Sequence, residues 1–331
     1  MGIADHGDPD GRSRSVSPVA GGIGSGPVTD DVAISVRGLR KSYGAVTAVD
    51  GLDLEIRRGE IFALLGPNGA GKTTAVEILE GFRTRDAGSV SVLGCDPGTQ
   101  RRRLKSRMGI VLQSTGVDPY LTVAETVAMY ASYYPHPRPI DEVIDLVGLG
   151  TKHDSRVLKL SGGQQRRLDV AIALAGDPEL LFLDEPTTGF DPSARHEAWE
   201  VVRNLATLGK TVVLTTHYMD EAQHLADRVA VVAAGRVVAE GSPSSLGGRD
   251  TATARIRYRV PSGLQPPAEF DGEAGPDGFV ELRPADLTAT LHGLTGWALG
   301  HGAALDSLQI IRPSLEDVYL HLTDGSETAP Q

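Results

Sequence analysis

The chain has 331 residues and a formal net charge of −11 at pH 7, from 43 acidic and 32 basic side chains. A chain of this length can bury one large core and a second, smaller one, and its acidic balance argues against an extended nucleic-acid surface, which needs a basic face. Cys95 is the only cysteine, which excludes a disulfide framework and a thiol metal cluster and suits the cytosol.

Residues 1–30 are rich in Gly, Ser, Asp and Pro. Asp5, Asp8 and Asp10 stand where a signal peptide would need positive charge and an apolar core. We therefore predict a disordered tail over this segment. No uninterrupted apolar stretch approaches the roughly twenty residues that span a bilayer, so a role at the membrane would require a separate membrane protein.

The apolar run from Ile61 to Leu65 predicts a strand, and the glycine loop after it predicts a phosphate-binding site. Residues 66–73 fit Gly-x-x-x-x-Gly-Lys-Ser/Thr. Glycines let successive N–H groups converge on phosphate oxygens at a helix N-terminus. The pattern assigns Lys72 to the β- and γ-phosphates and Thr73 to Mg²⁺. A chance glycine turn before a helix is the alternative. The predicted nucleotide-binding residues of the loop are Gly66, Asn68, Gly69, Gly71, Lys72, Thr73 and Thr74.

A short turn and an apolar strand follow further along the chain. Residues 160–164 read Leu-Ser-Gly-Gly-Gln and open a predicted helix that runs to about Ala175, so free N–H groups there form a second anion site. Ser161 as a plain helix N-cap is the simpler interpretation. Residues 180–183 predict a strand buried on both faces that ends in Asp184 and Glu185. A solvated acidic strand end would leave the following Pro-Thr-Thr-Gly-Phe-Asp unexplained.

The phosphate loop, the Ser-Gly-Gly-Gln turn and the Asp-Glu strand, in this order and spacing, resemble the ATPase subunit of an ABC transporter. The resemblance extends from about Val32 to Thr323. It implies an α/β fold, the P-loop ABC ATPase, with a RecA-like core, an antiparallel β subdomain and a helical subdomain at about residues 100–175. It also implies ATP and Mg²⁺ as cofactors.

The resemblance implies roles for five further side chains. Asp184 would hold Mg²⁺ through water, and Glu185 would polarise the water that attacks the γ-phosphate. Gln113 would reach Mg²⁺ and link ATP to the membrane partner, and His217 would contact the γ-phosphate. Tyr43 would stack on adenine. A buried core tyrosine is the alternative for Tyr43, and a lone histidine at a strand end is more often structural.

In this family the Ser-Gly-Gly-Gln turn faces the γ-phosphate of ATP held by a second subunit. The resemblance therefore implies a head-to-tail homodimer with two shared ATP sites, and it adds to the cofactor-binding residues Ser161, Gly162, Gly163, Gln164 and Asp191. Phe190 departs from the family, which usually has an aliphatic residue before the aspartate at the dimer seam. Its bulk could change how the subunits couple.

Two segments bear on the membrane partner. Residues 121–147 have a helical pattern and resemble the subdomain on which permeases dock. Residues 152–157 lack the Gly-Glu-Arg-Gly type of loop found in exporters whose ATPase is fused to its membrane domain, which favours the separately encoded ABC-2 class. The implied location is the cytoplasmic face of the membrane, peripheral through the permease. The basic run 101–107 could face anionic lipid or a permease loop, but a solvated helix start is the simpler interpretation.

The composition changes after residue 241. Alternation at 254–260 and apolar runs at 279–282 and 308–311 predict strands, and two helical stripes predict helices at 287–297 and after Ser314. The ending resembles the close of daunorubicin-resistance-type ATPases, and no catalytic cluster appears in this part. The predicted organisation is an N-terminal tail 1–30, an ATPase domain 31–241, a linker 242–251, a small α/β accessory domain 252–323 with a structural or regulatory role, and a tail 324–331.

The sequence thus predicts the energy-coupling ATPase of a multi-component exporter with a drug, antibiotic or lipid-like cargo. Soluble ABC ATPases of DNA repair insert a long coiled coil between the loop and the turn, and fewer than a hundred residues intervene here. Translation factors of this family have two cassettes per chain, whereas this chain has one. A nucleotide-binding module without catalysis is disfavoured by Glu185. Import instead of export stays open, because the motor is similar.

Overall fold

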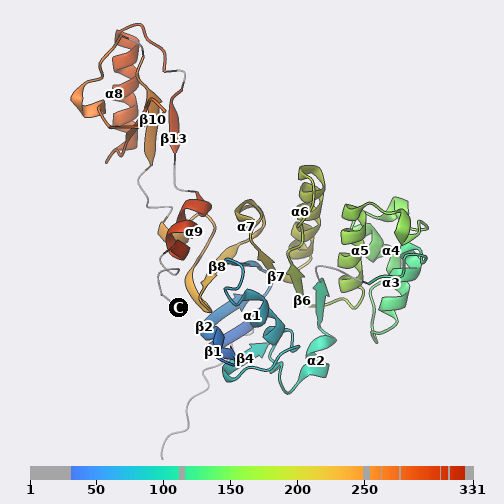
Figure 1. Ribbon diagram of the computed structural model, residues 1–331. Coiled ribbons are helices and arrows are strands. Elements are labelled where there is room, and N and C mark those ends of the chain that lie inside the picture. The colour runs from blue at the N-terminus through green and yellow to red at the C-terminus, as the bar shows by residue number, and fades with distance from the viewer. Residues whose placement is uncertain are drawn as a thin grey trace, which may run out of the picture. The chain divides into compact units, whose positions relative to one another are not determined.

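The computed structural model describes residues 31–111, 116–248, 254–261, 263–275, 277–305, 307–311 and 314–324 (Figure 1). These residues form a six-stranded, a three-stranded and a four-stranded sheet with helices, which is the α/β fold expected from the sequence. The tail predicted at 1–30 and all but the first residue of the tail predicted at 324–331 lie outside the described residues; Asp324 is the last residue of a helix. Within the described ranges, no helix combines the length and the apolar character needed to cross a bilayer.

The six-stranded sheet positions the candidate site. Its strand order is β5-β6-β7-β3-β8-β9, and all neighbours run parallel except the edge pair of β8 and β9. Parallel strands end at the same edge, where ligands bind in open α/β sheets. The loops after β3, β6 and β7 therefore meet at one edge. The bounds are β3 (Ile61–Leu65), β5 (Met108–Val111), β6 (Leu180–Asp184), β7 (Thr211–Thr216), β8 (Arg228–Ala233) and β9 (Arg236–Gly241).

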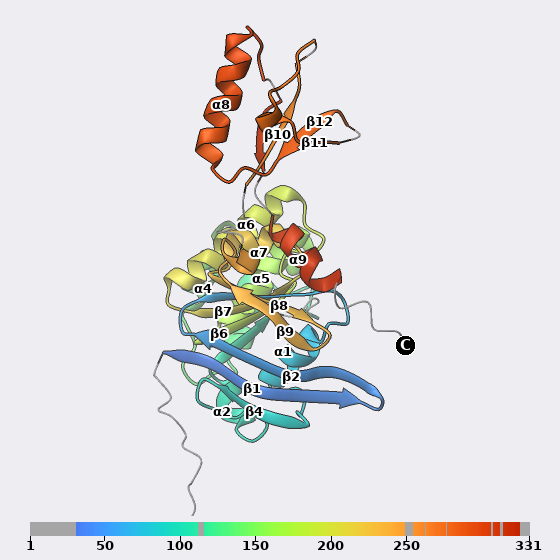
Figure 2. The same ribbon diagram turned by 90° about the vertical axis from the view of Figure 1, so that its left-hand side faces the viewer.

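One face of this sheet is covered by the antiparallel sheet of order β2-β1-β4 and by helix α1. Phe62 and Leu64 of β3 point into this core, together with apolar residues of α1. Figure 2 shows the antiparallel sheet, in blue and teal, as a layer distinct from the six-stranded sheet. The bounds are β1 (Val32–Tyr43), β2 (Val46–Arg57), β4 (Ala87–Val92) and α1 (Lys72–Leu79).

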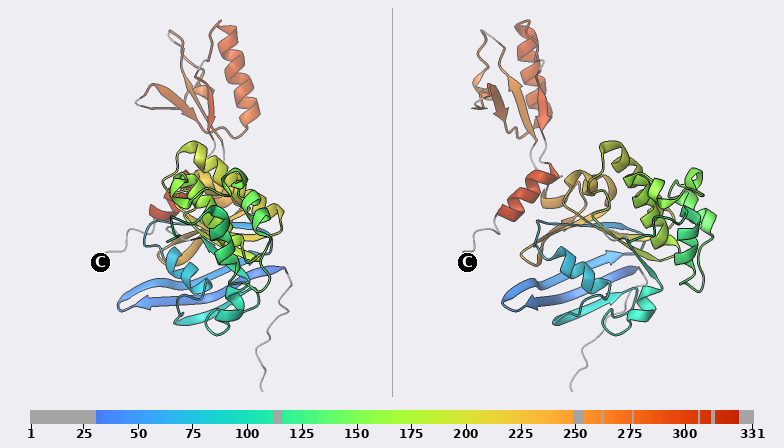
Figure 3. Two further views of the ribbon diagram at one scale, coloured as in Figure 1. Left: turned by 90° about the vertical axis from the view of Figure 1, so that its right-hand side faces the viewer. Right: turned by 45° about the vertical axis from the view of Figure 1, so that its right-hand side comes forward.

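The other face packs against helices. Ile61, Ala63 and Leu65 of β3 point into this second core. Helices α3, α4 and α5 pack on one another, and α5 also contacts α6; the three form the green group at one end of the sheet in Figure 3. The bounds are α3 (Val123–Ala131), α4 (Ile140–Leu146), α5 (Gly162–Leu174), α6 (Pro192–Thr207) and α7 (Met219–Leu225), with short 3-10 turns at η1 (Gly150–Lys152) and η2 (Val157–Lys159).

The range proposed for the helical subdomain, 100–175, also contains elements that belong elsewhere. Helix α2 (Arg101–Lys105) contacts β5, and β5 pairs with β6 inside the six-stranded sheet. In α2 the single apolar residue, Leu104, is fully buried, and the four basic side chains are exposed. The basic residues from Arg101 to Lys105 thus form the solvent face of a short helix, whereas Arg107, at the end of the run, is partly buried and paired with Glu179.

The four-stranded sheet has its own core. Its order is β11-β12-β10-β13, and Ile256, Tyr258, Val280 and Leu294 are buried between it and helix α8. The Tyr258 hydroxyl donates a hydrogen bond to the Phe270 carbonyl at 2.6 Å. The bounds are β10 (Arg255–Arg259), η4 (Ala268–Phe270), β11 (Glu273–Ala274), β12 (Phe279–Leu282), α8 (Leu287–Gly300) and β13 (Gln309–Ile311).

Helix α9 (Leu315–Asp324) contacts the ATPase part of the chain. Leu315 is 1% exposed and belongs to the core on the helical face of the six-stranded sheet, and α9 contacts α7 and the 3-10 turn η3 (Leu246–Gly248). Leu246 is buried in the same core. The segment expected to be a linker, 242–251, therefore holds a core residue, and the end of the range assigned to the accessory domain packs on the ATPase part.

Glu80 is a buried carboxyl at the C-terminus of α1, only 5% exposed. Burial, together with the nearby Asp184 and Glu77 carboxylates, raises its pKa from 4.5 to about 8. The folded protein thus holds this proton more tightly than the unfolded chain. Its contribution to stability is complete below about pH 4.5 and is lost as the pH rises toward 8. At about 1.4 kcal/mol per pKa unit, the loss amounts to a few kcal/mol.

We therefore expect Glu80→Gln to raise the melting temperature of the nucleotide-free protein at about pH 9 by several degrees and to leave it nearly unchanged at about pH 5. Thermal unfolding at the two pH values checks this. Glu200→Gln, at an exposed position of α6, is the matched control and should shift neither value. An equal effect of Glu80→Gln at both pH values would contradict the assignment.

Candidate nucleotide-binding site

The loop between β3 and α1 has two positions, Gly66 and Gly71, that leave no room for a side chain. Gly71 has φ +99° and caps α1, and a Cβ built on it would lie 2.1 Å from the Ala48 carbonyl oxygen of β2. A Cβ on Gly66 would lie 2.3 Å from the Val232 carbonyl oxygen of β8. The loop backbone therefore lies directly against two strands, with the N-terminus of α1 open to an anion.

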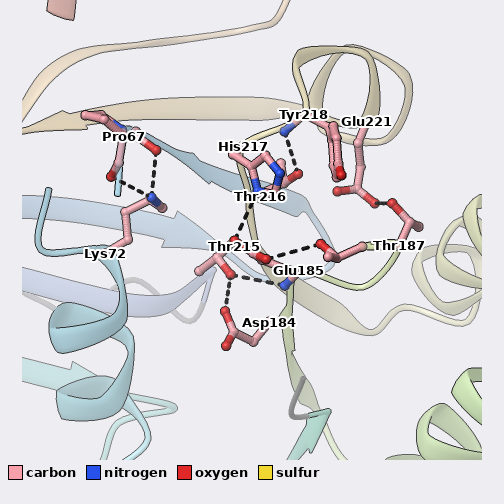
Figure 4. A network of polar contacts seen from close by, with 12 residues as sticks. Pro67, Lys72, Asp184, Glu185, Thr187, Thr215, Thr216, His217, Tyr218 and Glu221 are labelled. Atoms are coloured by element: carbon pink, nitrogen blue, oxygen red, sulfur yellow. Dashed lines mark hydrogen bonds and ion pairs between the residues drawn. The ribbon is translucent and has the colours of Figure 1, made fainter. Parts of the chain in front are cut away.

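Lys72 folds back over this loop. Its Nζ donates hydrogen bonds to the carbonyl oxygens of Gly66, at 2.6 Å, and Pro67, at 3.0 Å (Figure 4). The residue is 8% exposed. Burial lowers the pKa of Lys72, while Glu185 and Asp184 oppose that change. A cation, a helix N-terminus and free glycine N–H groups at one point form a site suited to a polyanion such as a triphosphate.

A cavity of about 300 Å³ lies over the loop and brings together most of the residues predicted to bind nucleotide. Tyr43 lines it, and at 41% exposure Tyr43 is not a core tyrosine. The Lys41 and Arg83 cations lie 5.4 and 5.5 Å from its ring centroid. The lining residues are Tyr43, Ala48, Asn68, Gly69, Ala70, Gly71, Lys72, Thr73, Thr74, Asp184, Glu185 and Thr215. The Thr73 hydroxyl and the Asp184 carboxylate supply the oxygen ligands that Mg²⁺ prefers.

Thr215, at the end of β7, joins the two carboxylates that follow β6. Its hydroxyl donates to Asp184 Oδ1 and lies 3.3 Å from the amide nitrogen of Glu185, which donates to it. The parallel register sets Asp184 directly opposite Thr215. Sequence reasoning missed this residue. The available signal was a pair of threonines ending an otherwise apolar strand.

Glu185 adopts a backbone conformation that is unusual for a residue with a side chain. Its φ is +44°, a left-handed value that costs energy outside glycine and persists only when the surroundings impose it. Arg166 of α5 is one such restraint: it donates to the carbonyl oxygens of Asp184, at 2.8 Å, and Pro186, at 3.2 Å. Burial lowers the pKa of Arg166, and nearby carboxylates offset this. Arg166 was also missed, because its distant partners are backbone atoms.

His217 lies beside Glu185. The His217 Nδ1 and Glu185 Oε1 atoms are 3.1 Å apart, and the Thr188 hydroxyl donates to Glu185 Oε2 at 3.1 Å. Figure 4 shows the imidazole and the carboxylate pointing toward one another at the ends of β7 and β6. Two residues predicted to act on the γ-phosphate are thus in direct contact.

The Ser-Gly-Gly-Gln turn is built as a capping box. Ser161 Oγ accepts a hydrogen bond from the Gln164 amide at 3.3 Å, and Gln164 Oε1 accepts one from the Ser161 amide at 3.1 Å. Asp191 likewise caps α6, accepting from the amides of Ser193 and Ala194. As far as the described residues define it, the 300 Å³ cavity is lined by none of Ser161, Gly162, Gly163, Gln164 and Asp191.

Gly162 lines a separate cavity of about 660 Å³ between α5 and the loop after β6. Phe190, the residue that departs from the family pattern, also lines this cavity, as do Glu185 and Thr188. Glu185 is the one residue common to the linings of the two cavities over the described chain. Gln113 lies outside the described residues, which stop at Val111 and resume at residue 116.

Comparison with known proteins identifies the family. Residues 49–188 match the family described as ABC transporter, and residues 254–314 match the C-terminal domain of ABC transporter domain-containing protein-like chains. The Nod factor export ATP-binding protein I of Ralstonia nicotianae is 40% identical over 324 residues, which cover 94% of this chain and 98% of that protein. The chain is an ABC transporter ATP-binding subunit.

Other relatives and solved structures also match this chain. The Nod factor export ATP-binding protein I of Sinorhizobium fredii is 41% identical over 88% of this chain and 86% of that protein. Among solved structures, cbiO1 from Clostridium perfringens, part of the ABC transporter complex cbiONQ, superposes with a TM-score of 0.60 and 29% identity, covering 65% of this chain and 90% of that one. The cassette MJ0796, in a dimeric structure bound to ADP and Pi, is 24% identical and superposes with a TM-score of 0.57. The match covers 63% of this chain and 98% of that one, and it supports the fold. This ABC subunit is an ATPase.

For this ABC subunit we expect Lys72→Ala to weaken nucleotide binding by on the order of tenfold to a hundredfold, the range typical of a lost hydrogen bond to a charged group. Titration with a fluorescent ATP analogue measures this. Lys105→Ala, at an exposed position of α2, is the control and should bind normally. If Lys72→Ala keeps full affinity, the glycine loop is not the nucleotide site.

Proposed function

We propose that this chain is the motor subunit of an ABC-2-type exporter and that it completes its ATP sites only as a head-to-tail homodimer. One observation carries the proposal. A single cavity holds the glycine loop, Lys72, Thr73, Asp184 and Glu185, whereas the Ser-Gly-Gly-Gln turn of the same chain does not line it. Each chain thus has two half-sites on different surfaces: the glycine loop with the two carboxylates, and the Ser-Gly-Gly-Gln turn.

In this proposal Lys72 leaves the loop carbonyls and contacts the β- and γ-phosphates, while Tyr43 stacks on adenine. Thr73, Asp184 and Gln113 would hold Mg²⁺, which would neutralise charge on the phosphate oxygens. The backbone N–H groups of Gly69 and of Gly71 to Thr74 bind phosphate oxygens at the start of α1. Gly66 and Gly71 let the loop lie against β8 and β2, where a Cβ atom would meet a strand carbonyl.

Glu185 acts as the general base that orients the attacking water, and His217 contacts the γ-phosphate. The hydrogen bond between Glu185 and His217 holds the carboxylate at the edge of the sheet that the cavity faces. Thr188 donates to the second oxygen of Glu185, so the carboxylate starts from a fixed orientation. Positioning of this kind is the main contribution that a protein makes to phosphoryl transfer.

The second subunit supplies the remaining donors. Ser161, Gly162, Gly163 and Gln164 present the N-terminus of α5 to the γ-phosphate bound by the partner's glycine loop, and Asp191 lies at the seam. The dimeric ADP- and Pi-bound cassette of the same fold supports this arrangement. The relatives described as Nod factor export ATP-binding proteins, which align along nearly the whole chain, support export.

We further propose that a separate permease holds the subunit at the cytoplasmic face of the membrane and carries the cargo, of a drug, antibiotic or lipid-like kind. The helical group α3 to α5 is the docking surface in this proposal. Residues 254–311, which form a sheet and helix with their own core, have a structural or regulatory role.

We expect Glu185→Gln to bind MgATP but to hydrolyse it roughly a hundredfold more slowly or worse, because the amide keeps the size of the side chain and cannot accept the proton. A stable dimer should then accumulate with ATP and separate without it, as measured by light scattering after size exclusion. Glu200→Gln should behave as the parent chain. Near-normal turnover of Glu185→Gln would remove this residue from its role.

The proposal that two subunits share each ATP site leads to a second prediction. Ser161→Arg chains should bind ATP through their own Lys72 but neither dimerise nor hydrolyse it, because a bulky cation replaces the turn that faces the partner's phosphate. Mixing them with Lys72→Ala chains leaves one composite site with both halves intact, so ATPase activity should recover in part. Normal hydrolysis by Ser161→Arg alone would place the turn outside a shared site.

A further inference from the structure

A buried carboxyl lies directly behind the candidate site. Glu221 of α7 is fully buried, at 0% exposure. Its Oε1 accepts hydrogen bonds from the Thr187 hydroxyl, at 2.8 Å, and from the Trp199 indole, at 3.4 Å. The Thr216 side chain also interacts with the Glu221 carboxyl, and within the described residues the buried Oε2 atom has no well-formed hydrogen bond. Such a poorly satisfied carboxyl costs stability, so its presence calls for an explanation other than stability.

The hydrogen bond between Thr187 and Glu221 joins the same two chain segments as the contact between Glu185 and His217. Thr187 follows Glu185 by two residues, and Glu221 follows His217 by four. The two segments are therefore joined twice: by the Glu185–His217 contact of 3.1 Å at the cavity and by the Thr187–Glu221 hydrogen bond in the interior. Figure 4 shows both connections in one view, with the buried one further from the glycine loop.

The buried connection is the better anchor of the two. Thr187 is 0% exposed, whereas Thr188 and Gly189 after it are exposed. Water competes poorly for a hydrogen bond in the interior, so the bond keeps a fixed geometry there. It lies next to Glu185, whose left-handed backbone needs external restraint. Arg166 restrains the carbonyls on the α5 side, and Thr187 is held from the α7 side.

We propose that Glu221 is a positioning residue for ATP hydrolysis: through Thr187 it fixes the loop of Glu185 against the segment of His217, so that both side chains face the γ-phosphate together. Glu221 touches neither nucleotide nor attacking water. The inference rests on the roles proposed above for Glu185 and His217. Burial raises the pKa of Glu221, and Oε1 can accept the hydrogen bond from Thr187 in either protonation state of the carboxyl.

The test removes the hydrogen bond from either side. Thr187→Val deletes the hydroxyl while keeping the shape, and Glu221→Leu deletes the acceptor. The double variant leaves two apolar groups facing each other, so that Thr187 no longer has an unpaired hydroxyl, although the Trp199 indole loses its acceptor as it does in Glu221→Leu. We expect each of the three to lower kcat by roughly tenfold to a hundredfold, as a displaced catalytic group does, with nucleotide affinity within about twofold of the parent. Thr187→Ser should regain most of the turnover that Thr187→Val loses.

A purely structural role is tested by Trp199→Phe. This variant removes the other hydrogen bond to the same oxygen, Glu221 Oε1, from a residue of α6 that follows neither Glu185 nor His217 closely. We expect a lower melting temperature and a kcat within about twofold of the parent. If Trp199→Phe lowers kcat as much as Thr187→Val does at equal loss of stability, Glu221 is only a stabilising residue and the inference is overturned.

A double-mutant cycle with His217→Ala tests whether the bond acts through the site. Thr187→Val should have almost no further effect in the His217→Ala background, because the contact that it positions is already gone. Fully additive losses would overturn the inference. The Glu185→Gln variant distinguishes a failure of the proposed function from a failure of the role of Glu221 alone. If Glu185→Gln hydrolyses ATP normally, the proposed function fails; if it is inactive while Thr187→Val and the double variant turn over normally, only the role of Glu221 fails.

Discussion

The parallel pairing of β6, β7 and β3 is the constraint on which the rest of the structure depends. Its register sets Leu65 opposite Thr216 and Asp184 opposite Thr215. The three strands are mostly apolar and buried on both faces, so a shift of one residue would move each side chain into the core on the opposite face. Because burial fixes the register, three loops that are far apart in sequence leave the sheet at the same level. The glycine loop, the carboxylates and the histidine owe their proximity to this pairing.

The polar groups at this edge of the sheet are held by residues that do not line the 300 Å³ cavity over the glycine loop. Arg166 contacts the backbone on one side of Glu185, and Thr187 is bound by Glu221 on the other. Both Arg166 and Glu221 are buried ionisable residues, which proteins rarely retain for stability alone. Their retention is explained by the strained backbone of Glu185, which Arg166 and Glu221 restrain through their hydrogen bonds. A mobile carboxylate would cost the folded protein less free energy, but it would not be oriented before nucleotide binds.

The sequence predicted the parts of this site that depend on local patterns. The glycine loop after β3, the carboxylates after β6 and the strands themselves follow from short-range composition, and the family resemblance supplied Tyr43 and His217. Thr215, Arg166 and Glu221 could not be predicted in this way, because their partners are 18 to 34 residues away and two of the contacts involve backbone carbonyls. The burial of Leu246 was hidden because a lone leucine in a polar segment carries no periodicity. Leu315 belongs to the helical stripe predicted after Ser314, and what the sequence did not show is that this helix packs on the ATPase part.

The path of the chain after β9 has a consequence for how this protein can be divided. The chain leaves the ATPase part at η3, forms the four-stranded sheet with α8, and returns at α9, where Leu315 enters the same core as Leu246. In topological terms the small domain is an insertion in a loop of the large one. A shortened protein that stops at the last strand of the six-stranded sheet would expose part of its own interior. Exchange of the small domain between relatives therefore requires two splice points, with α9 left in place.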